Sequence, residues 1–130
     1  MIVGMGIDMV EVERVRRALE DPRTGERFRA RVYTAGEVEY CERRRAGRFR
    51  SYAARFAVKE AVMKALGRGW GAEARWLDIE VVRAAGGRPE IALHGKTARL
   101  AERLGVVRWS VSISHTDRYG LACVAAEDAR

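Results

Sequence analysis

Residues 55–67 read RFAVKEAVMKALG, and drawn as a helix they place an apolar side chain on nearly every face. This pattern is typical of a helix that packs on several sides, and Gly67 favours a left-handed C-cap that ends it. Lys59, Glu60 and Lys64 interrupt the apolar surface. Because an unpaired buried charge is costly, each of them needs a partner or a function.

The segments before this helix predict one strand and three further helices. A short apolar strand over residues 2–7 precedes an amphipathic helix whose apolar face carries Val12, Val15 and Leu19. A second short helix is expected over residues 28–32. Thr34 followed by Glu37 fits a capping box and predicts a helix from about residue 35.

The segments after this helix change to the period of β-strands. WLDIEVV (residues 76–82) alternates, which predicts a half-buried strand with Leu77, Ile79 and Val81 inward and Asp78 and Glu80 outward. The turn AAGGRP then leads into PEIAL, so the two strands form a hairpin. An amphipathic helix, GKTARLAERLG, comes next, followed by the strands VVRWSVSIS and GLACVAA joined by HTDRY. The order predicts an α+β fold, a single domain over residues 1–130 with a mainly antiparallel sheet packed against helices.

Composition and charge restrict the kind of partner. Lys plus Arg outnumber Asp plus Glu by 25 to 18, giving a net charge of +7, so we expect an anionic partner: nucleic acid, a phosphate-rich cofactor or an acidic protein. The densest basic segment, ERRRAGRFR (residues 42–50), is typical of a solvated loop or helix end. No apolar run approaches the roughly 20 residues of a membrane span. Cys41 and Cys123 predict two buried, reduced thiols in a cytoplasmic protein.

The N-terminal segment contains a candidate carboxylate. Gly4 and Gly6 do not complete a dinucleotide-binding fingerprint, because Met9 occupies the place of its third glycine. Asp8 follows the predicted strand where the chain passes into the first helix. An aspartate there commonly caps a helix, and spacing alone favours this role over metal binding.

Glu60 and Lys64 stand four residues apart and share one face of the central helix. On an exposed helix they would form a weak ion pair, worth about 0.3–0.5 kcal/mol. Their neighbours here are apolar, so we expect both charges to be partly desolvated. A divalent cation would satisfy the carboxylate and a phosphate the ammonium group. Lys59 points to another side, where its ammonium group is expected to reach solvent.

His115 and Thr116 open the loop between the last two strands. Ser114, His115 and Asp117 cannot form a catalytic triad, since residues so close in sequence cannot all converge. Imidazole and hydroxyl donors at the end of a strand suit a phosphate contact instead. Ser112 and Ser114 alternate onto one side of the strand.

Four segments together resemble one family. GIDMVEVERV, RFAVKEAVMKALG, GGRPEI and SISHT follow one another as they do in the holo-acyl-carrier-protein synthases, the small trimeric 4'-phosphopantetheinyl transferases. The resemblance covers nearly the whole chain. It departs from the family at Gly120, where alanine is frequent, and in the loop GRGWGAEARW, whose length varies in the family.

This resemblance implies the 4'-phosphopantetheinyl transferase fold and a Mg²⁺-dependent reaction of fatty acid biosynthesis. The enzyme would move phosphopantetheine from coenzyme A to a serine of apo acyl carrier protein and release adenosine 3',5'-bisphosphate. The resemblance also implies a homotrimer with active sites between subunits. Asp8 and Glu60 would bind the metal, and Lys64 would complete the catalytic set beside the phosphates. The implied coenzyme A contacts are Arg55, Lys64, Gly87, Arg88, Pro89, Ser114, His115 and Thr116. Arg14 and Arg17 would bind the carrier protein.

Two other function classes fit part of the pattern. A nucleic-acid-binding module would use the arginines of residues 43–50, but it leaves Asp8 and Glu60 unexplained. A non-catalytic scaffold for an acidic protein would need no metal. The resemblance implies neither nucleic acid nor membrane as a partner, and it leaves open whether Glu60 or a water molecule takes the proton of the serine.

Overall fold

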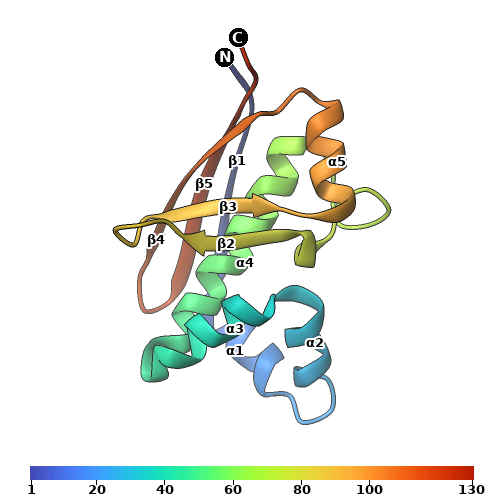
Figure 1. The fold of residues 1–130 in the computed structure, drawn as a ribbon. Helices are drawn as coiled ribbons and strands as arrows, with labels where there is room; N and C mark the ends of the chain where they lie inside the picture. Colours follow the sequence, from blue (N-terminus) through green and yellow to red (C-terminus); the bar gives the residue numbers. More distant parts are fainter.

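Helix α4 (Arg48–Leu66) runs through the middle of the molecule, with three strands along one side, a two-stranded hairpin across it and the shorter helices around its ends (Figure 1). The computed structural model describes all 130 residues. Eleven residues of α4 are buried, which confirms the prediction of a helix packed on several sides. The other elements, in chain order, are β1 (Ile2–Glu11), α1 (Val12–Glu20), α2 (Gly25–Val32), α3 (Ala35–Arg43), η1 (Arg45–Gly47), η2 (Trp76–Asp78), β2 (Ile79–Arg83), β3 (Pro89–Leu93), α5 (Gly95–Arg103), β4 (Arg108–His115) and β5 (Tyr119–Glu127).

All strand pairs are antiparallel, as predicted, but they form two separate sheets. β5 lies between β1 and β4 in a three-stranded sheet, while β2 and β3 form a hairpin of their own. The predicted α+β class is therefore confirmed, with one large sheet and one hairpin around α4 (Figure 1).

Glycines allow α4 to lie directly on β1 and β5. A Cβ atom at Gly4 or Gly6 would overlap the main-chain carbonyls of Ala65 or Ala61 in α4. A Cβ atom at Gly120 in β5 would come within 2.8 Å of the Ala54 nitrogen. The first two glycines thus serve close packing of a strand on a helix.

Several predicted helix ends are confirmed. The Thr34 hydroxyl accepts from the Glu37 N–H at 3.2 Å, and the Glu37 carboxylate accepts from the Thr34 N–H at 2.9 Å, which completes the capping box. Gly67 ends α4 with φ of 72°. Helices α2 and α5 also form in the segments where the sequence predicted a helix.

Two predictions about local structure are wrong. β1 continues to Glu11, so Asp8 lies inside the strand opposite Ala122, and it cannot cap α1. The segment Trp76–Asp78 is a 3₁₀ turn rather than part of β2. Asp78 is therefore buried, where it accepts hydrogen bonds from the Thr97 backbone and hydroxyl, and Leu77 is exposed.

Neither cysteine forms a disulfide; Cys41 is buried and Cys123 is half-buried. None of the helices has both the length and the apolarity that crossing a membrane would require.

Candidate active site

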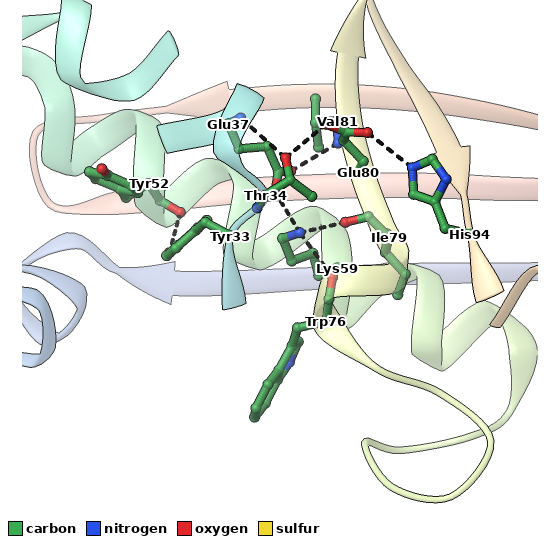
Figure 2. A network of polar contacts seen from close by, with 10 residues as sticks. All are labelled: Tyr33, Thr34, Glu37, Tyr52, Lys59, Trp76, Ile79, Glu80, Val81 and His94. Atoms are coloured by element: carbon green, nitrogen blue, oxygen red, sulfur yellow. Dashed lines mark hydrogen bonds and ion pairs between the residues drawn. The ribbon is translucent and has the colours of Figure 1, made fainter. Parts of the chain in front are cut away.

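Lys59 of the central helix is completely buried, so its ammonium group does not reach solvent as expected (Figure 2). Its Nζ atom donates to Glu37 Oε1 at 2.8 Å, to the Trp76 carbonyl at 3.0 Å and to the Ile79 carbonyl. Burial lowers the pKa of Lys59, while the adjacent Glu37 carboxylate opposes that effect. Three acceptors match the three N–H bonds of an ammonium group, so this lysine has a structural role.

The other two charges lie on a different side of α4 and face β1. Lys64 Nζ donates to Asp8 Oδ1 at 3.0 Å and to the Ile7 carbonyl at 2.9 Å. Lys64 thus pairs with Asp8 and not with Glu60. The fold brings together the three residues that the family resemblance implied as the catalytic set.

Asp8 and Glu60 line one open pocket of about 430 Å³. β1 supplies the aspartate and α4 the glutamate, and α1 contributes Arg14 to the rim. Most of the remaining wall is apolar: Met9, Val10, Val15, Ala18, Phe28, Phe56 and Trp76. The pocket therefore offers two carboxylates at the edge of a surface that excludes much of the water.

Burial raises the pKa of the Glu60 carboxyl, and the nearby Asp8 charge adds to this effect. The Trp76 side chain and Lys64 act in the opposite direction. A carboxylate whose charge is disfavoured in this way gains from a cation placed between it and Asp8. No cluster of three or more metal-ligating side chains occurs in the structure. Two carboxylates suit Mg²⁺, which takes few protein ligands and completes its octahedron with phosphate and water oxygens.

A second pocket, of about 440 Å³, is strongly basic. Its lining includes His115 at the end of β4 and Arg43, Arg44 and Arg50 around the start of α4. Arg50 also pairs with Asp117 at 2.9 Å. The sequence predicted an exposed segment here, and the segment is mostly exposed, but the pocket that it forms with His115 was not predicted. In the sequence, only the close spacing of these arginines indicated such a pocket.

Glu60 lies ten residues after Arg50 in α4. At 1.5 Å per residue, the two pockets are about 15 Å apart along this helix. They share no lining residue.

The remaining predicted coenzyme A contacts fall into two groups. Arg88 and Pro89, which follow Gly87 in the β2–β3 turn, line a third pocket together with Arg108, Trp109 and Ser110 of β4. Ser114 is exposed on β4. The Thr116 hydroxyl accepts from the backbone N–H groups of Arg118 and Tyr119 at 3.1 and 3.0 Å, so it also closes the loop after β4.

Arg55 is almost fully buried, and its guanidinium group lies 4.0 Å from the centre of the Tyr40 ring. Its Nε atom is buried without a hydrogen-bond partner. A phosphate contact through Arg55 stays a prediction, and it requires a ligand that reaches beneath the surface.

The two arginines predicted to bind a carrier protein are both exposed on α1. Arg14 lines the pocket of Asp8 and Glu60, whereas Arg17 points to Glu11, 3.7 Å away. The pocket and the basic side of α1 therefore form one continuous region.

The outer face of the three-stranded sheet is apolar and uncovered on β1 and β5, whereas β4 presents Ser110, Ser112 and Ser114 on the same face. Met5, Ile7 and Met9 of β1 are 61, 59 and 62% exposed, and Leu121 of β5 is 37% exposed. A contiguous apolar surface of this kind is typical of a protein interface.

The chain is similar in sequence to the members of one enzyme family. Residues 4–124 match the family model described as the 4'-phosphopantetheinyl transferase superfamily. The chain is 50% identical to a holo-acyl-carrier-protein synthase of Solibacter usitatus, over 98% of this chain and 100% of that protein. It is 47% identical to the synthase of Koribacter versatilis, with the same coverage.

Solved structures agree with the sequence comparison. The holo-acyl-carrier-protein synthase of Neisseria meningitidis superposes with a TM-score of 0.87 at 31% identity, over 98% of this chain and 100% of that one. The Helicobacter pylori synthase in complex with coenzyme A gives a TM-score of 0.81 at 29% identity, over 95% and 99% of the two chains.

Proposed function

The chain belongs to the holo-acyl-carrier-protein synthases of the 4'-phosphopantetheinyl transferase superfamily, and from this we propose that it transfers 4'-phosphopantetheine from coenzyme A to apo acyl carrier protein. The observation that carries the proposal is that Asp8 of β1 and Glu60 of α4 line one pocket, while Lys64 of α4 donates to Asp8. The whole of residues 1–130 would act as one transferase domain. Fatty acid biosynthesis in the cytoplasm is the setting that fits this reaction.

The reaction forms one bond and breaks another at the same phosphorus. The serine oxygen of the carrier protein bonds to the phosphorus that bears pantetheine, and the bond from this phosphorus to the bridging oxygen breaks. Adenosine 3',5'-bisphosphate leaves with the electron pair, and the serine proton passes to a base. Catalysis of such a transfer depends on alignment and on neutralising the phosphate charge.

Asp8 and Glu60 fit a single Mg²⁺, and they would hold it against the pyrophosphate. When bound, Mg²⁺ supplies charge neutralisation at the phosphate oxygens. Lys64 is 57% exposed, so its ammonium group is free to turn from Asp8 to the same phosphates. Glu60, or a water molecule beside it, would accept the proton of the serine.

The basic pocket supports a coenzyme A substrate. Coenzyme A carries a 3'-phosphate as well as its pyrophosphate, so it presents negative charge at two separated places. The arginines around His115 offer donors for one of these, and the pocket of Asp8 and Glu60 would hold the other through its cation. Arg88 and Pro89 would contact the nucleotide.

A homotrimer with sites between subunits is part of the proposal. On one chain, the predicted coenzyme A contacts His115, Arg88 and Pro89 line pockets that share no residue with the pocket of Asp8 and Glu60. A neighbouring copy seated on the outer face of β1 and β5 would cover the exposed Met5, Ile7 and Met9. It would also bring a second set of these pockets close to the two carboxylates.

The decisive experiment incubates the purified protein with coenzyme A and an apo acyl carrier protein, with and without Mg²⁺. We expect stoichiometric release of adenosine 3',5'-bisphosphate, measured by chromatography, and a gain of one phosphopantetheine in the mass of the carrier. A carrier in which the acceptor serine is replaced by alanine serves as the control. Binding of both substrates without any transfer would overturn the proposal.

A further inference from the structure

Trp76 lies in the wall of the pocket that contains Asp8 and Glu60, and the mechanism above gives it no role. Its indole Nε1 atom is buried and forms no hydrogen bond within the structure. An indole N–H is only a donor, and a buried donor without an acceptor costs about 1–3 kcal/mol. A hydrogen-bond acceptor in the pocket would therefore remove this cost.

The Glu60 carboxylate is the acceptor that the surroundings offer. It lines the same pocket as the indole, and it stands one helical turn after Phe56, whose ring packs against that of Trp76. The other carboxylates of the pocket, Asp8 and Glu11, come from β1 instead.

Two aromatic rings pack against the ring of Trp76. The Phe56 ring centre lies 5.9 Å away, and the Trp70 ring stacks at 5.3 Å with an angle of 24° between the planes. The Trp76 carbonyl accepts from Lys59, and Figure 2 shows the ring extending away from that contact.

Lys59 and Glu60 are neighbours in α4, so their side chains leave the helix about 100° apart. Lys59 donates to the backbone of Trp76, and Glu60 lines the same pocket as its ring. The buried pair of Lys59 and Glu37 thus fixes the point from which the indole reaches into the pocket.

We propose that Trp76 is a positioning residue, whose indole N–H donates to the Glu60 carboxylate and holds it toward Asp8 so that both can bind one cation. The role of the cation rests on the proposed function, whereas the hydrogen bond does not. Trp76 would not touch the reacting atoms, and its effect would pass entirely through Glu60.

NMR spectroscopy tests the hydrogen bond directly. The three tryptophans give three indole N–H signals, and Trp70→Phe and Trp109→Phe assign the third to Trp76. We expect Glu60→Gln to shift the Trp76 signal and to speed its exchange with solvent, because a neutral amide oxygen is a weaker acceptor. Asp8→Asn changes the charge of the same pocket without removing the acceptor, so it should shift the signal much less. Equal shifts in both variants, or none, would overturn the proposal.

Metal binding and kinetics test the consequence. Trp76→Phe keeps the aromatic packing but removes the donor, and Trp70→Phe is the matched control. We expect Trp76→Phe to weaken Mn²⁺ binding, measured by electron paramagnetic resonance, by about ten-fold, the size of one hydrogen bond to a charged group. The kcat should fall by a similar factor, with KM for both substrates near that of the wild type. Urea denaturation checks that the variant is folded.

The two proposals fail in different ways. If the wild type transfers no phosphopantetheine, the proposed function is wrong, but the NMR comparison still decides whether Trp76 donates to Glu60. If the wild type is active and Trp76→Phe binds Mn²⁺ and turns over like Trp70→Phe, the role of Trp76 is wrong and the function stands.

Discussion

Lys59 Nζ and Glu37 Oε1 lie 2.8 Å apart, and neither side chain is accessible to solvent. Besides this ion pair, Glu37 accepts from the backbone of Thr34 and Val81, and Lys59 donates to two carbonyls near β2 (Figure 2). The pair therefore joins α3, α4 and the hairpin, and every charge in it has hydrogen-bond partners. This explains the first of the three charges in the apolar helix.

Lys59→Met should lower the free energy of unfolding by about 3–5 kcal/mol, because it leaves the Glu37 carboxylate buried without its counter-ion. Lys96→Met, at an exposed position of α5, is the matched control and should change it by less than about 0.5 kcal/mol. Urea denaturation followed by circular dichroism measures both. Equal stability of the two variants would show that Glu37 finds a substitute partner.

Gly6→Ala tests the close packing of β1 on α4. The added Cβ would overlap the Ala61 carbonyl, so the strand must move away from the helix and carry Asp8 with it. We expect a loss of stability at or above the upper end of the ~1–3 kcal/mol range for overpacking, and a loss of transferase activity. Gly69→Ala is the control, since no atom lies within 4 Å of a Cβ there. The variants are compared by thermal unfolding and by the release of adenosine bisphosphate.

The fold around α4 could be predicted well, because apolar periodicity and caps are local properties of the sequence. The partner of Lys59 could not, since Glu37 lies 22 residues earlier and meets it only in the folded chain. The length of β1 was underestimated for a similar reason: its last residues are held as a strand by pairing with β5. Asp78 was predicted to face outward because strand alternation cannot foresee its bonds to Thr97.

The candidate site, like the fold, could be predicted from the sequence only in part. Resemblance to the family indicated Asp8, Glu60 and Lys64 as a set, but the ion pair of Lys64 with Asp8 rather than Glu60 depends on how β1 crosses α4. The basic pocket around His115 was missed, because its members come from the start of α4 and the end of β4. Trp76 gave no signal in the sequence at all.

Asp8→Asn and Glu60→Gln should each reduce kcat by about 10²-fold or more while keeping the fold, since each removes a ligand charge without changing shape. In metal-free buffer at neutral pH, Glu60→Gln should also unfold at a higher temperature than the wild type. Burial raises the pKa of Glu60, so the stability associated with its protonated form is lost as the pH rises, and the amide restores it. Near-normal Mg²⁺-dependent turnover in either variant would contradict the metal assignment.

Met5→Glu tests the trimer through the outer face of β1. A charge at this exposed apolar position should dissociate the assembly, because burying it between copies without a partner is unfavourable. Leu104→Glu introduces the same charge at another exposed apolar position and should leave the assembly intact. Light scattering coupled to size-exclusion chromatography reports the mass of each variant. A monomeric wild type, or a trimer that tolerates Met5→Glu, would remove this face from consideration.

Arg14 and Arg17 test how the carrier protein is recognised. Both arginines are exposed on α1, and Arg14 lies in the wall of the pocket of Asp8 and Glu60. An acidic carrier that approaches along α1 would present its serine to the carboxylates, so exposed positive charge there should steer the encounter. We therefore expect Arg14→Glu with Arg17→Glu to raise KM for the carrier protein by about ten-fold or more, with little change in KM for coenzyme A.

Salt and the single variants make this last prediction more specific. Added salt screens the attraction, so the double variant should also lose the salt dependence of the wild type. Arg14→Glu alone should account for most of the effect, because Arg17 already faces Glu11 and lies farther from the pocket. Arg99→Glu on α5 makes the same charge change at another exposed position and serves as the control. If the double variant keeps the wild-type KM and salt response, the carrier docks elsewhere, and the arginines of residues 43–50 become the surface to test.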